Sequence, residues 1–168
     1  LLEELLQDKR TWEDAMTEVY GPLRIDDKSP ILVWTDGSCL DPNRPSATAG
    51  SGVFWGPDSE RNRFIRLPGA VQTSNRAELL AMLVAIDSTD PLRALVIYSD
   101  SEYAIRSVAE WAPARADTGW TCKNGDLLQR IQQAIQRRLA MLHLVWIPSH
   151  SGNAHNDGAD ALAKKGAA

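Results

Sequence analysis

The chain has 168 residues, of which 43% are hydrophobic and 24% charged, a composition typical of one globular domain with a well-filled core. No apolar run approaches the roughly 18 residues of a transmembrane helix, so we expect no membrane contact. The net charge of −4 arises entirely in residues 1–30, which hold eight acidic and four basic residues. Residues 31–168 hold fourteen acidic and fourteen basic residues, so this part of the chain can present a phosphate-binding surface.

Residues 1–30 are predicted to be an N-terminal extension that precedes a domain at residues 31–168. Apolar residues recur at helical spacing through residues 1–20, and Gly21-Pro22 and a polar linker follow. We interpret this segment as a helix that packs on the domain or on a missing neighbour. The first residue is not Met, so we expect a piece excised from a longer protein.

The hydrophobic pattern of residues 31–168 predicts an α/β domain with a mixed sheet flanked by helices. Short apolar runs predict five strands, of which the fourth, an unbroken run, should be buried on both faces. Their ranges are 31–39, 50–56, 63–67, 94–100 and 142–147. Helical spacing predicts four helices, the second of which should end near Pro113. Their ranges are 75–86, 102–110, 124–138 and 157–165.

Four acidic residues lie at strand ends or near helix starts of this pattern. Asp36 ends the first strand and Asp100 the fourth, while Glu78 and Asp160 lie about one turn into helices, and Asp157 competes with Asp160. Parallel neighbouring strands would bring Asp36 and Asp100 to one edge of the sheet. Converging carboxylates need a cation, and hard oxygen ligands suit Mg²⁺, with Mn²⁺ as a substitute. Two such ions could activate a phosphodiester for hydrolysis.

Two histidines lie near the end of the chain. His150 lies in a loop before the last helix, where an imidazole could shuttle a proton or simply face solvent. A zinc site formed by His150 and His155 is disfavoured, because no further ligand completes the set. The two cysteines, Cys39 and Cys122, have neither zinc-knuckle nor disulfide-framework spacing, so we expect a reducing intracellular setting, with cytoplasm and nucleus left open.

Ordered motifs around these residues resemble those of type 1 ribonuclease H. They are Thr-Asp36-Gly-Ser-Cys, Thr-Ser-Asn-Arg-Ala-Glu78-Leu, Tyr-Ser-Asp100-Ser-Glu-Tyr-Ala, Pro-Ser-His150-Ser-Gly and Ala-Asp160-Ala-Leu-Ala. The resemblance implies a ribonuclease H-like fold with a five-stranded sheet in the order 3-2-1-4-5. It also implies Mg²⁺-dependent cleavage of the RNA strand of RNA–DNA hybrids, leaving 5′-phosphate ends, with the four acids as metal ligands and His150 assisting product release or proton transfer.

The resemblance also implies substrate contacts. Cys39 and Leu40 match positions whose backbone contacts RNA 2′-hydroxyls. Ser74 and Asn75 match minor-groove residues, although Ser74 replaces a familial amide, and Trp111 and Asn124 match positions that touch DNA. Many family members carry a longer basic segment where this chain has only Thr121-Cys122, so we expect weaker hybrid binding.

Three functional alternatives follow. The first is an active hybrid nuclease, expected to be monomeric, which is free-standing or the ribonuclease H domain of a retroelement polyprotein beside a reverse transcriptase. The second is a catalytically inactive module that binds nucleic acid or protein, which the retained acids disfavour. The third is a transposase or integrase of the same fold, which the position of Glu78 within its helix disfavours.

Overall fold

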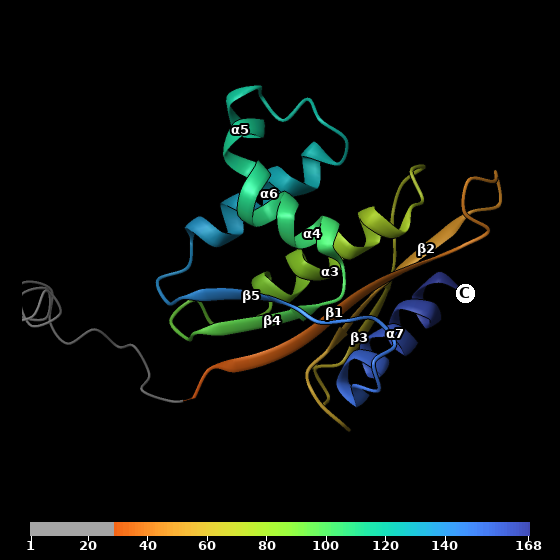
Figure 1. The fold of residues 1–168 in the computed structure, drawn as a ribbon, viewed down its shortest axis with the longest axis horizontal. Coiled ribbons are helices and arrows are strands. Elements are labelled where there is room, and N and C mark those ends of the chain that lie inside the picture. Colours follow the sequence, from red (N-terminus) through yellow and green to blue (C-terminus); the bar gives the residue numbers. More distant parts are fainter. Residues whose placement is uncertain (1–28) are drawn as a thin grey trace, which may run out of the picture.

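The computed structural model describes residues 29–168, which form a five-stranded sheet with helices on both faces (Figure 1). The first three strands form an antiparallel meander, and the last two add parallel to the first on its other side. The resulting order, β3-β2-β1-β4-β5, confirms the predicted fold. The strands are β1 (Ile31–Leu40), β2 (Thr48–Phe54), β3 (Arg63–Arg66), β4 (Leu95–Ser99) and β5 (Leu142–Trp146). The predicted N-terminal helix lies outside the described residues.

Most helices lie on one face of the sheet, and the last lies on the other (Figure 1). The first group is α3 (Ser74–Asp87), α4 (Glu102–Arg106), the π-helical turn η1 (Ser107–Trp111), α5 (Ala112–Asp117) and α6 (Gly125–Gln136). On the opposite face, α7 (Ala154–Ala167) packs over β1, β2 and β3. Within residues 29–168, every helix is too short or too polar to span a bilayer.

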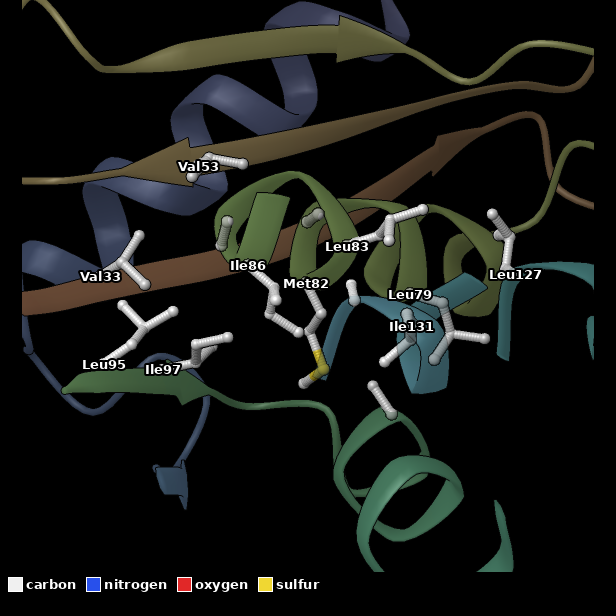
Figure 2. Packing of buried hydrophobic residues seen from close by; sticks show 14 of the residues in the cluster. Val33, Val53, Leu79, Met82, Leu83, Ile86, Leu95, Ile97, Leu127 and Ile131 are labelled. Atoms are coloured by element: carbon white, nitrogen blue, oxygen red, sulfur yellow. The ribbon is translucent and has the colours of Figure 1, made fainter. Parts of the chain in front are cut away.

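The main core fills the space between the sheet and α3. Alternate residues of β1 and β4, including Val33 and Ile97, point toward Leu79 and Met82 of α3, as Figure 2 shows. Ile131 closes this core from α6. These side chains are between 0 and 1% exposed, so the core holds α3 firmly against the strands that carry the predicted acids.

Two predictions about chain segments are wrong. The helix that begins at Glu102 does not end near Pro113, because the chain widens into the π-helical turn and then restarts as α5, with Pro113 in its first turn. A proline is tolerated there, since the first turn of a helix needs no backbone donor. The fourth strand is not buried on both faces, because its residues alternate between buried and half-buried.

The last helix begins earlier than predicted. It starts at Ala154 rather than Asp157, because the Asn153 side chain accepts hydrogen bonds from the backbone N–H groups of His155 and Asn156, at 3.0 and 3.1 Å.

Helix α7 lies directly on the backbone of β2. A Cβ atom at Gly52 would lie 2.2 Å from the carbonyl oxygen of Ala159, so only glycine allows this approach.

Candidate active site

Three acidic side chains converge just past the end of β4 and beside the middle of β1. Asp36 does not end its strand as predicted, because β1 continues to Leu40 in its pairing with β2. The parallel pairing aligns Thr35 with Ser99, so the next residues, Asp36 and Asp100, reach the same edge of the sheet. Glu78 joins them from the beginning of α3. One carboxylate oxygen from each of the three residues lies within 4.8 Å of the other two. The structure therefore brings together three of the four acids predicted from the sequence.

Gly37 makes this convergence possible. It follows Asp36 in β1 and lies against the first turns of α3. A Cβ atom at residue 37 would lie 2.5 Å from the backbone nitrogen of Glu78 and 2.8 Å from the carbonyl oxygen of Ser74. Because both are backbone atoms, any larger residue would push α3 away from β1 and carry Glu78 with it.

Burial raises the pKa values of Asp36 and Glu78. Asp36 is 5% exposed and Glu78 is 6% exposed. Burial, opposed by hydrogen bonds with Glu78 and the Gly37 N–H, raises the pKa of Asp36 to about 7. Burial, followed by the negative charge of Asp36, raises the pKa of Glu78 well above its ordinary value. The three groups repel one another when ionised, so the cluster favours a proton or a cation.

The donor set fits a divalent metal ion. All three side chains offer hard oxygen ligands, which Mg²⁺ and Mn²⁺ prefer. The Oε2 atom of Glu78 is buried and contacts no donor within residues 29–168, although buried acceptors are normally satisfied. A cation held by the three carboxylates would satisfy this oxygen and remove their mutual repulsion.

Asp160 lies apart from the three clustered acids. It is on α7, two turns from the helix start, and its Oδ2 atom forms an ion pair with Lys164 Nζ at 2.7 Å. Its negative charge still contributes to the raised pKa of Asp36, so it lies within electrostatic reach of the cluster. The fourth predicted ligand therefore stands beside the site and is turned toward Lys164.

Asn156 is a site residue that the sequence did not reveal. Its Nδ2 atom donates a hydrogen bond to Asp100 Oδ2 at 3.2 Å, and the residue is 2% exposed. Its Oδ1 atom is buried without a donor in the part of the chain that the structure describes. The sequence offered one signal for this residue: Asn156 lies four residues before Asp160, and this spacing places the two residues on the same side of a helix.

The two histidines have different surroundings. His150 is exposed in the loop between β5 and α7, with a left-handed backbone (φ 51°). His155 stacks on Trp34 with ring centroids 4.3 Å apart, which indicates a packing role. Neither histidine belongs to the acid cluster with metal-binding geometry that residues 29–168 form.

Comparison with known families agrees with this arrangement. Residues 28–168 match the family model described as RNase H. The chain belongs to the type 1 ribonuclease H family. The order of its strands and the three clustered acids are those that the motifs of this family imply.

Relatives of this ribonuclease H domain include two eukaryotic proteins. Ribonuclease H1 of Homo sapiens is 36% identical over 143 residues, which make up 82% of this chain and 50% of that protein. Ribonuclease H of Schizosaccharomyces pombe is 37% identical over 142 residues, or 81% of this chain and 52% of that protein. The chain thus spans about half the length of these relatives. The comparisons do not establish the retroelement origin considered from the sequence.

A solved structure shares the fold. LC9-RNase H1, described as a type 1 RNase H with the type 2 active-site motif, matches with a TM-score of 0.65 and 26% sequence identity. The match covers 84% of this chain and 74% of that one. The ribonuclease H fold therefore accounts for nearly all of the described residues.

The residues expected to contact substrate form two groups in the structure. Ser74 and Asn75 are exposed in the first turn of α3, and Leu40 is 43% exposed at the end of β1. Cys39 is half-buried, and its Sγ atom donates to the Gln72 carbonyl oxygen at 3.4 Å. Because Gly37 of β1 contacts the start of α3, these residues form one rim beside the acid cluster.

Asn124 and Trp111 belong to a second group, which a polar network connects to α3. Asn124 has a left-handed backbone (φ 59°) and donates through Nδ2 to the Tyr103 hydroxyl at 3.0 Å. Arg76 Nη1 donates to its Oδ1 atom at 3.5 Å and binds Asp126 in a bidentate pair at 2.8 and 2.6 Å. Tyr103 also packs edge to face against Trp111. Arg76 therefore ties Asn124 to the helix that carries Glu78.

Proposed function

We propose that this domain hydrolyses the RNA strand of RNA–DNA hybrids with Mg²⁺, for which Mn²⁺ can substitute. The observation that carries the proposal is the convergence of Asp36, Glu78 and Asp100 at the edge of a ribonuclease H sheet. Two ions are proposed, with Asp160 completing the ligand set after its side chain turns from Lys164. That rotation needs only a side-chain change, because the Asp160–Lys164 pair is partly exposed and such pairs are weak.

Each acidic residue has a role that follows from its position. Asp36 interacts with both other acids and would hold the metal together with them. Glu78 is held rigidly by α3, and Asp100 is held by Asn156. When bound, the divalent ions neutralise the cluster, polarise the scissile phosphate and acidify the attacking water. The raised pKa values of Asp36 and Glu78 mean that metal binding has to displace a proton from the site.

The proposed reaction is the hydrolysis of a phosphodiester. A water oxygen forms a bond to phosphorus while the bond from phosphorus to the 3′-oxygen breaks. The proton lost by the water leaves the site, and the 3′-oxygen takes up a proton. The products are a 5′-phosphate and a 3′-hydroxyl. His150 is proposed to carry a proton or assist product release, since its exposed loop leads directly to the α7 residues at the site.

The end of β1 is suited to sensing RNA. Strand β4 pairs with β1 only as far as Thr35, so beyond that residue one edge of β1 has no strand neighbour among residues 29–168. Backbone groups at Cys39 and Leu40 are proposed to contact 2′-hydroxyls along this rim, with Ser74 and Asn75 in the minor groove. Asn124 and Trp111 are proposed to contact the DNA strand, where the Arg76 network fixes the position of Asn124.

The test is cleavage of a 5′-labelled RNA–DNA hybrid with Mg²⁺, beside single-stranded RNA, duplex RNA and duplex DNA. We expect cleavage only of the hybrid RNA, lost on addition of EDTA and in Asp100→Asn. The matched control is Asp58→Asn, which changes an exposed acid in the turn between β2 and β3 and should leave cleavage unchanged. A folded wild-type chain that binds the hybrid but cleaves nothing with either Mg²⁺ or Mn²⁺ would instead be the inactive binding module.

A further inference from the structure

The face of the sheet that carries α7 is covered only in part. Helix α7 packs over β1, β2 and β3. Within residues 29–168, α3 packs against β4 and α4 packs against β5, and both helices lie on the opposite face of the sheet (Figure 1). The α7 side of β4 and β5 is therefore open in the part of the chain that the structure describes, while on β1 the His155 ring of α7 stacks on Trp34 and covers part of it.

This open face carries mainly apolar side chains. The strand register places Leu32 beside Val96 and His143, and Trp34 beside Tyr98 and Val145, all on the side away from the main core. Leu32 is 41% exposed, and the other apolar members of this strip are half-buried. A continuous apolar strip of this kind marks a docking surface more often than a solvated one. We call these six residues the open strip.

We propose that residues 1–20 dock on the open strip as an amphipathic helix. Leu2, Leu5, Trp12, Met16 and Val19 follow one another at intervals of three, seven, four and three residues, which places them on one side of an α-helix. A helix is about 10 Å wide, and three neighbouring strands span about 10 Å between their outer axes. The apolar side of one helix therefore matches the width of the strip.

The covalent connection places this segment near the open strip. The described chain begins at Ser29, whose carbonyl oxygen accepts a hydrogen bond from Arg93 Nη2 at 2.8 Å. Ser29 lies just before β1, at the end of the strip that holds Leu32. The eight linker residues Gly21–Lys28 can span up to about 27 Å, which is enough to bring a helix back over the strip. A tethered segment also has a high local concentration and needs little intrinsic affinity.

Charges at the connection are complementary. Arg93 precedes β4, and Arg138, which precedes β5, donates through Nη2 to the Arg93 carbonyl oxygen. The Nε atoms of both residues and Nη1 of Arg138 are buried, and none of them contacts an acceptor within residues 29–168. Asp26 and Asp27 lie three and two residues before Ser29. Because the Nη2 atom of Arg93 already contacts the Ser29 carbonyl oxygen, carboxylates two or three residues away can reach the Arg93 guanidinium group and hold the linker at this end of the sheet.

The test uses covalent footprinting of the full chain, in which a reactive carbene labels exposed side chains. The docking variant is Leu5→Glu/Trp12→Glu/Met16→Glu. The control variant is Gln7→Glu/Thr11→Glu/Thr17→Glu, which adds the same charge on the opposite side of the predicted helix. Phe64 and Val71, which are 49 and 53% exposed on other surfaces, serve as internal references.

We expect low labelling of Leu32, Val96 and Val145 in the wild type and the control variant. In the docking variant the labelling of Leu32 should rise about fourfold, from the level of a buried side chain, about 10% exposed, toward its 41% exposure without the segment. Equal, strong labelling of the strip in wild type and docking variant would overturn the proposal. Protection that disappears on dilution would also overturn it, because the occupant would then be a second copy of the chain.

Discussion

Gly37 offers the sharpest test of how the fold positions the clustered acids. In Gly37→Ala the new Cβ would lie 2.5 Å from the Glu78 nitrogen, 2.8 Å from the Ser74 oxygen and 2.9 Å from the Ala77 carbonyl carbon. Because these are backbone atoms, α3 has to move by about 1 Å to restore ordinary contact distances near 3.5 Å. Such overpacking costs about 1–3 kcal/mol of folding free energy. Since a displacement of about 1 Å in a catalytic group can cost about 10²-fold in rate, we expect hybrid cleavage to fall about a hundredfold in a folded protein.

The assay is single-turnover cleavage of the RNA–DNA hybrid with saturating Mg²⁺, beside denaturant unfolding of each variant. Ile86→Ala is the control for lost stability, because Ile86 is 3% exposed at the far end of α3 and its truncation should cost about 2–5 kcal/mol without moving Glu78. We expect this control to cleave at nearly the wild-type rate while folded. Wild-type cleavage by Gly37→Ala would refute the reasoning, since the α3–β1 contact would then not set the position of Glu78.

Three further predictions concern the site and its surroundings. The metal-free chain should lose stability as pH rises from about 4 to 7. The folded state keeps a proton on Asp36, whose pKa is about 7, whereas the unfolded state has already lost that proton. The effect is worth at most about 4 kcal/mol, and denaturant unfolding in EDTA that shows no such slope would contradict it. Asn156→Ala should lower cleavage about tenfold and raise the Mg²⁺ concentration needed for half-maximal rate, because Asp100 loses its N–H donor; an unchanged Mg²⁺ titration would show that Asn156 does not position it. Asp126→Asn should raise KM severalfold with little change in kcat, because it weakens the Arg76 network that fixes Asn124. Steady-state kinetics in which kcat alone falls would exclude a role of this network in substrate binding.

Much of the fold could be predicted because local patterns and tertiary packing agree. The apolar run before Asp36 forms the first half of β1, and the helical spacing after Thr73 forms α3, which Thr73 caps. Parallel pairing of β1 with β4 then brings Asp36 and Asp100 together, as the edge of an α/β sheet requires. The position of Glu78 followed from the same helix start. The order of the strands came from the family resemblance and not from the pattern itself.

The remaining features depend on contacts between distant segments. Asn156 reaches Asp100 across 56 residues, and no local pattern reveals that pairing. The prediction that Pro113 ends a helix failed because a π-helical turn allowed a new helix to begin at that point. The run at β4 suggested burial on both faces, but its second face stays half-buried within residues 29–168, which is the observation behind the proposed docking of residues 1–20.

The contact between α7 and β2 also bears on the order of folding. The Thr48 hydroxyl donates to the Ala167 carbonyl oxygen at 2.7 Å across 119 residues, and Gly52 lies directly against Ala159. Contacts between such distant segments form late, because the entropy of closing the intervening loop must be paid first. We therefore expect the β1–β2–β3 meander and α3 to form before α7 is seated. Refolding chains would then pass through a state in which Asp100 still lacks Asn156, and catalytic competence would be the last property that they acquire.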